Sequence, residues 1–411
     1  MTHFVIIGAG ECGVRAAFAL REKGFEGEVT LVGAEPVTPY ERPPLSKAAL
    51  ANGAAPKFIA ASEQYSEKDI RLLTGVTALE LEATGRSVLL SDGSRLSYDK
   101  LLLATGASAR SFPGTSANSA RIRSLRTHRD AMTLRSVLKP GSHIVIVGGG
   151  FIGLEVAATA RQLGAKVTVV EGLERVLKRG VPTEIADMVT ARHRSEGVVI
   201  RCGVSIETIT ERDNKALVRL TAGEFVEADL VLIGIGAQPN VDLATKAGLA
   251  VDNGIAVDGR LRTSAPDIFA AGDCCSFPLG VYGGRRIRLE SWRNAQEQGE
   301  IAAVNMMGGD EIVSSVPWFW SDQYDLTLQV TGLADSAVTH LKRDLSNGAF
   351  ILFHLDVDGR LVAASGIGPG NSVARDIRVA EMLIAARARP TSAALTAGDV
   401  KLKSLLAALG L

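Results

Sequence analysis

Two glycine-rich segments of the chain have the residue spacing that binds the pyrophosphate of a dinucleotide. In this pattern the first glycine permits a tight turn, the second lets the backbone approach the pyrophosphate, and the third lets a helix pack closely on a strand. The helix that follows contributes free backbone N–H groups and the positive end of its dipole to the phosphates. The glycines are Gly8, Gly10 and Gly13 in GAGECG, and Gly148, Gly150 and Gly153 in GGGFIG.

Each glycine segment lies between a short apolar strand and a helix, and a second apolar strand follows, so each copy predicts a complete βαβ unit. The predicted strand, helix and second strand cover residues 5–7, 14–20 and 29–32 in the first copy and 145–147, 154–163 and 167–170 in the second. A glycine-rich turn that binds nothing is the alternative for either copy. One such unit suggests a dehydrogenase, whereas two suggest a flavoprotein.

Each copy is also followed by an apolar strand that ends in glycine, at residues 97–106 and 228–236, which makes the repeat more than two matching motifs. We therefore expect an α/β protein with two Rossmann-like nucleotide-binding domains, one inserted in the other, plus a smaller C-terminal α+β domain. The expected domains are 1–110 with 240–316, the insert 111–239, and the C-terminal domain 317–411, which closes with alanine-rich helices at 374–387 and 397–409.

The composition is that of a globular enzyme, with 46% hydrophobic and 22% charged residues among 411. Lys plus Arg and Asp plus Glu both number 45, so the net charge gives no support for nucleic-acid binding. Apolar runs are far shorter than the roughly 20 residues that span a bilayer, and the N-terminus leads directly into a strand. We expect a cytoplasmic protein with no membrane contact. The six histidines are scattered, so we expect no metal site.

An acidic residue after the second strand of such a unit usually binds the adenosine ribose hydroxyls. Glu171 occupies this position in the second copy and favours NADH over NADPH, because a carboxylate repels a 2′-phosphate; the nearby Arg175 would soften that preference. In the first copy the aligned residue is Gly33 and the nearest acid is Glu35. Glu35 is thus the ribose candidate of the first copy, displaced by two residues, and a surface glutamate is the alternative.

The ordered set of motifs resembles a known family over nearly the whole chain. GAGECG, PYERPPLSK, ATGA, GGGFIGLE, GIGAQPN, FAAGDC, ESWRNAQEQG and PWFWSDQYD are similar to the FAD-dependent NADH:ferredoxin reductases of bacterial cytochrome P450 and ring-hydroxylating dioxygenase systems. The resemblance implies a glutathione-reductase-like fold, FAD at the first glycine segment and NAD(H) at the second. It also implies electron transfer to a small 2Fe-2S ferredoxin.

The same resemblance implies roles for individual residues. Asp273 would contact the ribityl or pyrophosphate part of FAD, although a helix N-cap explains the same position. Thr105 and Gly106 would lie along FAD, or form a plain strand-end turn. The further residues expected to contact a cofactor are Arg42, Pro44, Trp292, Trp320 and Gly236. Core packing is the alternative for the two tryptophans.

Lys47 and Glu155 are the expected catalytic residues, by their match to the family's flavin-facing lysine and its paired acid. A cation beside the ring would stabilise electron density on reduced flavin, and the acid would hold the lysine charged and oriented. Pro43 and Pro44 restrict the loop before Lys47. The alternative is a surface lysine and a solvated helix glutamate.

Four cysteines, Cys12, Cys202, Cys274 and Cys275, contain no C-x-x-C pair, so buried packing is the favoured interpretation. No cysteine pair could take both electrons from a flavin, and a one-electron iron-sulfur acceptor is the natural alternative. Because ferredoxins are acidic, a basic docking surface is expected. The candidates are Arg285, Arg286, Arg288, Arg293, Lys342 and Arg343.

Two other readings compete. NADH oxidases, peroxidases and CoA-disulfide reductases use a cysteine in the loop after the first βαβ unit, and residues 38–50 contain none. A flavoprotein similar to apoptosis-inducing factor would act through partner or DNA binding, and neither a targeting segment nor net positive charge supports it. The particular ferredoxin, the terminal oxygenase and the oligomeric state are not indicated by the sequence.

Overall fold

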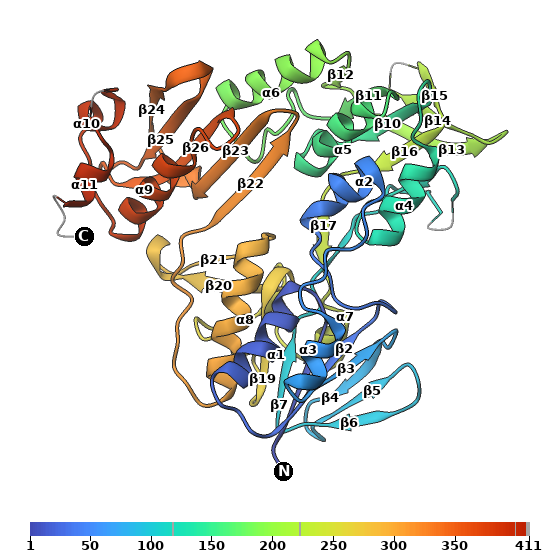
Figure 1. Ribbon diagram of the computed structural model, residues 1–411, viewed down its shortest axis with the longest axis vertical. Coiled ribbons are helices and arrows are strands. Elements are labelled where there is room, and N and C mark those ends of the chain that lie inside the picture. The colour runs from blue at the N-terminus through green and yellow to red at the C-terminus, as the bar shows by residue number, and fades with distance from the viewer. Residues whose placement is uncertain (117–118, 222, 399, 408–411) are drawn as a thin grey trace. The chain divides into compact units, whose positions relative to one another are not determined.

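The computed structural model describes residues 1–411 except 117–118, 222, 399 and 408–411 (Figure 1). The described chain forms two compact units, each assembled from separate segments. The first unit contains Met1–Glu41, Pro56–Ser108 and Gln238–Pro317, and the second contains Arg42–Ala55, Ala109–Ala237 and Trp318–Leu411. Two short strands, β8 (Ala107–Ala109) and β17 (Ala237–Pro239), lie where the chain leaves the first unit and returns to it.

The first unit is built on a five-stranded parallel sheet in the order β19-β7-β1-β2-β3. Its strands are almost continuously apolar because helices and loops cover both faces; Val5, Ile6 and Leu31, for example, are fully buried. The strands are β1 (His3–Ile7), β2 (Glu28–Gly33), β3 (Ile70–Thr74), β7 (Lys100–Leu103) and β19 (Ile268–Ala270). Parallel pairing places the carboxyl ends of β1, β7 and β19 at one edge.

Two long helices of the first unit pack side by side, α1 (Glu11–Glu22) and α8 (Trp292–Met306), as Figure 1 shows. Gly299 of α8 permits this close approach, because a β-carbon there would lie only 2.5 Å from the Cys12 carbonyl oxygen of α1. The remaining elements are α3 (Ser62–Glu67), α7 (Asp242–Lys246), an antiparallel sheet of β4 (Ala78–Glu82), β5 (Ser87–Leu90) and β6 (Arg95–Ser97), and a small sheet of β18 (Ile255–Ala256), β20 (Cys275–Leu279) and β21 (Arg285–Ile287).

The second unit contains another parallel sheet, in the order β12-β11-β10-β16-β9. Its strands are β9 (Ile122–Arg123), β10 (His143–Val147), β11 (Lys166–Glu171), β12 (Val199–Cys202) and β16 (Leu230–Ile233). The polar stretch from residue 199 divides in two. β12 joins this parallel sheet, and β13 (Ile206–Arg212), β14 (Lys215–Leu220) and β15 (Phe225–Ala228) form a separate antiparallel sheet. The helices are α2 (Ala48–Asn52), α4 (His128–Val137), α5 (Phe151–Gln162) and α6 (Thr183–Ser195).

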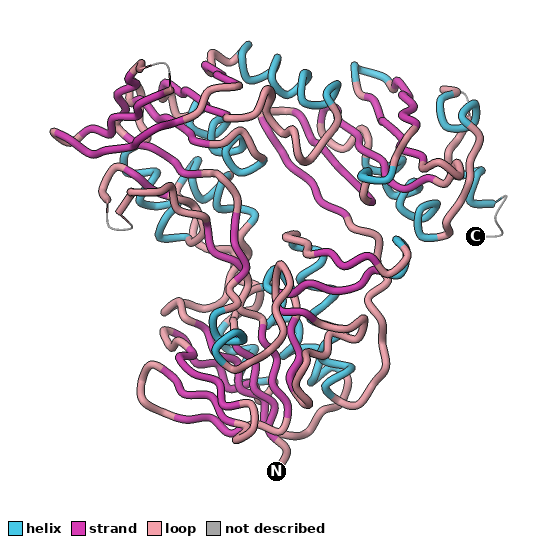
Figure 2. The backbone as a smooth tube through the Cα atoms, turned by 180° about the vertical axis from the view of Figure 1, so that it is seen from behind, coloured by secondary structure: helices cyan, strands magenta, loops and turns pink. Residues whose placement is uncertain are grey.

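The C-terminal segment of the second unit forms an antiparallel sheet in the order β22-β23-β26-β25-β24. Its strands are β22 (Trp318–Gln323), β23 (Leu326–Gly332), β24 (Thr339–Asp344), β25 (Phe350–Leu355) and β26 (Leu361–Pro369), shown with the other strands in magenta in Figure 2. The first predicted C-terminal helix is α9 (Ala374–Ala385). Within the second predicted helix, 397–409, the structure describes the short helix α11 (Lys403–Ala407), and the expected end at 409 lies outside the described residues. Another short helix, α10 (Ser392–Thr396), comes before the predicted start.

The C-terminal sheet and the parallel sheet of the second unit share one buried cluster, in which Leu328 and Ile367 join Leu154 and Val189. The segment Arg42–Ala55 also belongs to the second unit, although its neighbours in sequence on both sides belong to the first. Sequence patterns place residues 42–55 with the first nucleotide domain and give no indication that this segment packs in the second unit. Among the described residues, no helix combines the length and apolar character needed to cross a bilayer.

Two histidines on neighbouring strands of the C-terminal sheet are in contact. The Nδ1 atoms of His340 and His354 are 2.9 Å apart, and Ser365 Oγ lies 3.4 Å from His354 Nε2. His354 is 1% exposed. Burial, with a smaller effect of His340, lowers the pKa of His354 to about 4. His354 is therefore neutral in the folded protein over a range where an unfolded histidine is charged.

We predict that His354 makes stability fall in mild acid. Since its pKa is lowered on folding from 6.5 to about 4, the unfolded state binds the extra proton, and stability is lost as pH falls below the unfolded value. The loss should reach about 2 kcal/mol at about pH 5. Urea unfolding at several pH values should show this slope reduced in His354→Gln and retained in His128→Gln. Equal slopes in wild type and His354→Gln would contradict the assignment.

Candidate functional site

The first glycine turn, residues 8–13, follows β1 at the carboxyl edge of its sheet. Gly8 has a φ of +115°, and a side chain there would lie 2.1 Å from the Ala104 carbonyl oxygen. A side chain on Gly13 would lie 1.9 Å from the Gly8 oxygen, whereas one on Gly10 would meet nothing within 4 Å. The outer glycines are thus required for packing, and the open side of Gly10 leaves room for a ligand.

Helix α1 begins at this turn without a capping side chain. Its N-cap is Gly10 in an extended conformation, which offers no side-chain hydrogen bond to the first helical N–H groups. Uncapped N–H groups and the positive helix end favour an anion. The open glycine and the uncapped helix together fit the pyrophosphate of a dinucleotide such as FAD.

Other predicted residues of the first unit lie at the same sheet edge. Thr105 and Gly106 follow β7; Thr105 Oγ1 donates to the Asn240 carbonyl over 2.7 Å, and Gly106 has a φ of +67°. Asp273 follows β19 inside a single 3₁₀ turn whose N-cap is Ala271, so it is not itself a helix N-cap. Glu35 accepts a 2.5 Å hydrogen bond from the Tyr40 hydroxyl. Trp292 is the first residue of α8.

Gln298 is a residue of this edge that sequence reasoning missed. Its Oε1 accepts from the Gly272 amide over 2.7 Å, next to Asp273, and the side chain is fully buried. Its Nε2 has no hydrogen-bond partner among the described residues. An orphaned buried donor beside the turn supports a polar ligand there. The sequence does contain a pointer to it, since Gln298 is the second glutamine of the family-like motif ESWRNAQEQG.

The second glycine turn, after β10, repeats the geometry of the first. Gly148 has a φ of +103°, and a side chain there would lie 2.4 Å from the Gly234 oxygen. A side chain on Gly153 would lie 2.4 Å from the Gly148 oxygen, and one on Gly150 would meet nothing within 4 Å. Helix α5 also begins without a capping side chain. This turn therefore also fits a dinucleotide pyrophosphate.

Glu171, at the end of β11, is held against the second turn by two backbone amides. Gly149 N–H donates to its Oε2 over 2.7 Å, and Leu173 N–H donates to its Oε1 over 2.8 Å. Arg175 is turned elsewhere: its guanidinium donates to the carbonyls of Val176 and Val181 over 3.2 and 2.9 Å. The acid is fixed at the turn, and the arginine is engaged by backbone oxygens.

Gly236 follows the next strand of this sheet, β16. It has a φ of +102°, and its carbonyl accepts a 2.9 Å hydrogen bond from the Arg110 amide. The structure thus gives Gly236 a turn position near the carboxyl edge of the second sheet.

Lys47 and Glu155 form an ion pair within the second unit. Lys47 Nζ is 3.2 Å from Glu155 Oε1, and Glu155 is only 5% exposed. Ser46 Oγ donates to Glu155 Oε2 over 2.5 Å, and Ser321 Oγ donates to Oε1 over 2.7 Å. A buried carboxylate needs both a counter-charge and hydrogen bonds, and Glu155 has both. The alternative of a solvated helix glutamate is excluded by this burial.

A second carboxylate, Asp322, also approaches Lys47. Its Oδ2 is 3.7 Å from Lys47 Nζ and accepts a 3.1 Å hydrogen bond from the Trp320 indole. Thr327 Oγ1 donates to its Oδ1 over 2.9 Å. Lys47 Nζ lies 5.8 Å from the centroid of the Trp320 ring, which stacks on Trp318 at 5.3 Å. Lys47 is therefore surrounded by two acids and an aromatic face.

Ser46, Ser321 and Asp322 were not predicted from the sequence, although PPLSK and WSDQ contain them. Ser46 lies in the loop before Lys47, and Ser321 and Asp322 lie on β22, so only the folded contacts bring them together. Pro43–Ser46 form a 3₁₀ turn that contains Pro44, and Arg42 before it donates to the Arg126 carbonyl. The backbone before Lys47 is thus fixed by two prolines and an arginine.

The buried thiols of the first unit are poor nucleophiles. Cys12, Cys274 and Cys275 are free and buried. Burial raises the pKa of each of these thiols. They are therefore protonated at neutral pH, and a protonated thiol does not attack a disulfide.

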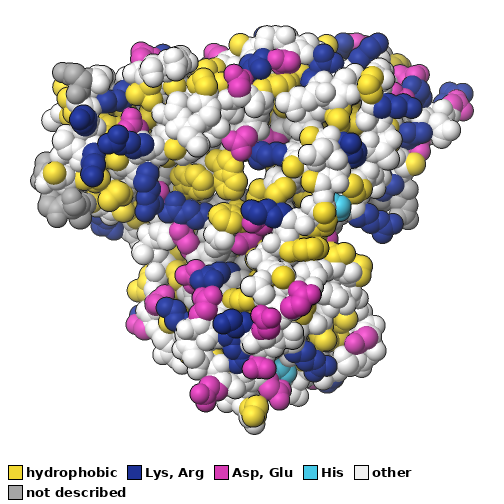
Figure 3. Space-filling model, in the orientation of Figure 1, with side chains coloured by type: hydrophobic (Ala, Val, Ile, Leu, Met, Phe, Trp, Pro, Cys, Tyr) yellow, Lys and Arg dark blue, Asp and Glu magenta, His cyan; other side chains and the backbone are white. Residues whose placement is uncertain are grey.

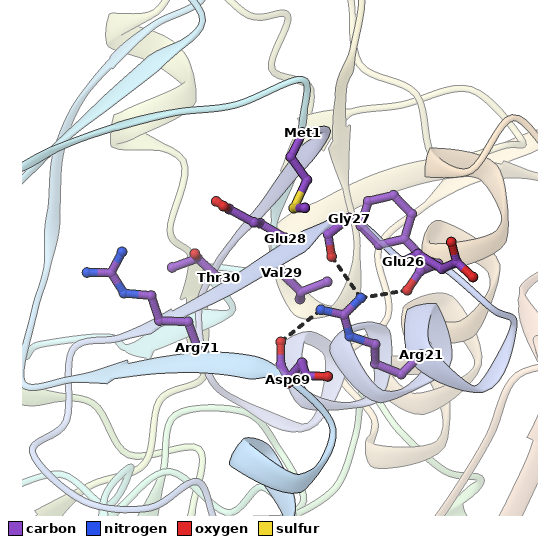
Figure 4. Close-up of a pocket in the computed structure, with 10 residues that line it drawn as sticks. Met1, Arg21, Glu26, Gly27, Glu28, Val29, Thr30, Asp69 and Arg71 are labelled. Carbon is purple, nitrogen blue, oxygen red and sulfur yellow. Dashed lines mark hydrogen bonds between the residues drawn. The ribbon is translucent and has the colours of Figure 1, made fainter.

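A pocket of about 600 Å³ lies at the opposite, amino end of β2 in the first unit. Figure 4 shows Arg21 there, donating to backbone carbonyls that include Gly27 and Asp69, both over 2.8 Å. Because backbone oxygens already engage its guanidinium, Arg21 ties loops together. The pocket shares no residue with either glycine turn.

The predicted docking cations differ in exposure. Arg343 is 4% exposed and donates to the Leu395 and Val400 carbonyls over 3.3 and 2.6 Å, so the expectation that it belongs to a docking surface is wrong. Alternation along β24 turns it toward α10, whereas Lys342 is exposed and pairs with Asp344. Arg288 has an 11% exposed side chain paired with Glu290, and Arg293 pairs with Glu297. Arg285 and Arg286 are exposed.

Comparison with protein families gives two matches. Residues 2–299 match the pyridine nucleotide-disulphide oxidoreductase family, and residues 318–406 match the reductase C-terminal family. The second match begins where the C-terminal sheet begins.

Similar proteins are ferredoxin reductases. The ferredoxin–NAD(+) reductase component of an anthranilate 1,2-dioxygenase system from Burkholderia cepacia is 41% identical over 98% of this chain and 99% of its own. Putidaredoxin reductase of Pseudomonas putida is 39% identical over 87% of this chain and 86% of its own. The reductase in a covalent putidaredoxin reductase–putidaredoxin complex superposes with a TM-score of 0.93, at 36% identity over 99% of this chain and 98% of that one.

Proposed function

The chain belongs to the pyridine nucleotide-disulphide oxidoreductase family, and we propose that it passes electrons from NADH through FAD to a 2Fe-2S ferredoxin serving a cytochrome P450 or a ring-hydroxylating oxygenase. It is an oxidoreductase of the ferredoxin–NAD(+) reductase type, and its cofactors are FAD and NAD(H). One observation supports the division of labour: both glycine turns fit a pyrophosphate, but only the second has an acid, Glu171, bonded across it.

The second turn is the proposed NADH site. Glu171 would accept the adenosine ribose hydroxyls of NADH and repel a 2′-phosphate. Arg175 would not offset that repulsion, since its guanidinium already donates to backbone carbonyls. The structure therefore supports a stricter NADH preference than the proximity of Arg175 in sequence suggests.

The first turn, with Thr105, Asp273 and Gln298, is the proposed FAD site. Bound FAD supplies uptake of two electrons as a hydride and their release one at a time. Lys47 would contribute a fixed positive charge that stabilises negative charge on the reduced ring. Glu155, Ser46 and Ser321 would keep that charge in place, and Asp322 would orient Trp320 beside it.

A one-electron acceptor is favoured by the protonated, buried thiols of the first unit. Residues 38–50 contain no cysteine, which disfavours the oxidase, peroxidase and CoA-disulfide reductase reading. The reading as a binding protein similar to apoptosis-inducing factor lacks a specific observation in its favour. Several relatives are named as components of dioxygenase systems, and this supports an oxygenase as the final destination of the electrons.

Replacing Lys47 by Ala should slow flavin reduction by NADH, roughly tenfold or more, because a charge aimed at the developing anion is lost. Stopped-flow absorbance of the oxidised flavin band would measure the rate. Lys166→Ala, an exposed lysine of the same unit, is the control and should match wild type. An unchanged rate in Lys47→Ala would remove Lys47 from the mechanism.

Glu171→Gln should raise the ratio of kcat/KM for NADPH to that for NADH by roughly tenfold, equivalent to about 1.4 kcal/mol of lost repulsion. Steady-state ferricyanide reduction with each nucleotide gives the ratio. Glu174→Gln, an exposed acid paired with Lys178, should leave it unchanged. A constant ratio in both variants would mean that Glu171 does not select the nucleotide.

Within the first unit, the exposed cations proposed for ferredoxin docking are Arg285 and Arg286 on β21. Lys342 on β24 of the second unit is a separate candidate. Over the face drawn in Figure 3, Lys and Arg side chains lie among Asp and Glu side chains, in keeping with the net charge of zero. Docking of an acidic ferredoxin would then depend on a few local cations.

The purified protein should reduce cytochrome c with NADH only when a 2Fe-2S ferredoxin is added. Arg285→Glu should lower that rate and its sensitivity to salt, by roughly threefold to tenfold, while NADH-driven ferricyanide reduction continues. Arg212→Glu, at an exposed arginine of β13, is the matched charge-reversal control. Full cytochrome c reduction without ferredoxin would overturn the proposed function, and equal loss in both assays would argue against docking at Arg285.

A further inference from the structure

Glu11 places a carboxyl group on the turn that is proposed to bind the FAD diphosphate. It is the first residue of α1 and follows Gly10, the glycine whose open side leaves room for a ligand. An acid at this place is unexpected, since the helix end and its free N–H groups attract an anion. Its role is absent from the mechanism described above.

The Glu11 carboxyl is half satisfied. Gln296 Nε2 on α8 donates to Oε1 over 2.8 Å. Oε2 is buried and has no hydrogen-bond partner among the residues that the structure describes. A buried carboxylate oxygen without a donor is costly, whereas a protonated carboxyl carries no charge and presents an O–H donor at that position.

Among the described residues that act on Glu11, the one cation is already paired with another acid. Trp292 on α8 faces the carboxyl, as do Glu41 and Lys57, but Lys57 is 2.9 Å from Glu41 and is paired with it. Tyr65 of α3 and Cys12 of α1 also lie near, and both are neutral at physiological pH because burial raises their pKa values. Burial likewise raises the pKa of Glu11, against smaller lowering effects of Gln296 and Trp292.

We propose that Glu11 takes up a proton from solvent when the FAD diphosphate binds at residues 8–13, so that the holoenzyme contains a neutral acid on this turn. An ionised Glu11 would add a third negative charge beside the two of the diphosphate. The neutral form removes that repulsion and leaves no charged oxygen buried without a donor. The inference rests on the proposed function only in taking FAD as the ligand of the first turn.

This coupling makes FAD affinity depend on pH with a defined sign. Above the pKa of Glu11 in the apoprotein, each binding event needs one proton, and the Kd for FAD should rise by up to about tenfold per pH unit. The isosteric variant Glu11→Gln keeps an acceptor for Gln296 and carries no charge. It should bind FAD with a Kd that does not follow pH, and more tightly than wild type in alkaline buffer.

The test is isothermal titration of the apoprotein with FAD in two buffers of different ionisation enthalpy, at about pH 7 and about pH 8.5. The difference in binding enthalpy between buffers counts the protons. Wild type should take up close to one proton in alkaline buffer, and Glu11→Gln should take up none. Glu22→Gln, an exposed acid on the same helix that pairs with Arg15, should behave as wild type.

The outcomes separate this inference from the proposed function. If wild type binds FAD without proton uptake, the inference is wrong and the FAD site stands, and this measurement needs no variant to fold. Equal proton uptake by wild type and Glu11→Gln would also overturn it, because another group would then titrate. A failure of the full chain to bind FAD at all would overturn the proposed function itself.

Discussion

In both parallel sheets the glycine that ends the first strand lies against a carbonyl of a neighbouring strand, at a separation that no side chain could occupy. The gap from a β-carbon to that oxygen would be 2.1 Å at Gly8 and 2.4 Å at Gly148. This contact brings the turn to the carboxyl edge of the sheet and aims the following helix at it. The features of each site depend on that one steric constraint, because it fixes where they lie. They are the open second glycine, the uncapped helix and the residues after β7, β16 and β19.

The two turns share a backbone and differ in the acids placed on them. At the second turn, Glu171 accepts hydrogen bonds from the backbone amides of Gly149 and Leu173, which suits the recognition of ribose hydroxyls. At the first turn, Glu11 lies on the helix itself with one oxygen unsatisfied. The two carboxyl groups thus differ in their surroundings. Glu171 accepts from two backbone amides, whereas Glu11 is the acid proposed to take up a proton.

The features that sequence patterns predicted are those set by residues close together in the chain. The glycine spacing, the strand before it and the acid at Glu171 are set by local register, so they could be read directly. Ser46, Ser321 and Asp322 could not, because they meet Lys47 and Glu155 only when a loop, a helix and the strand β22 pack together. The burial of Arg343 could not be predicted either. Alternation along β24 does not tell which face is buried, because that depends on the helices that follow the sheet.

Arg42–Ala55 belongs to the second unit although both flanking segments belong to the first, and the chain passes between the units again after Ser108, Ala237 and Pro317. Neither unit can therefore be completed early during synthesis on the ribosome. The first needs residues up to Pro317, and the second needs strands that come later still. No single cleavage of the chain would consequently separate either unit from every segment of the other.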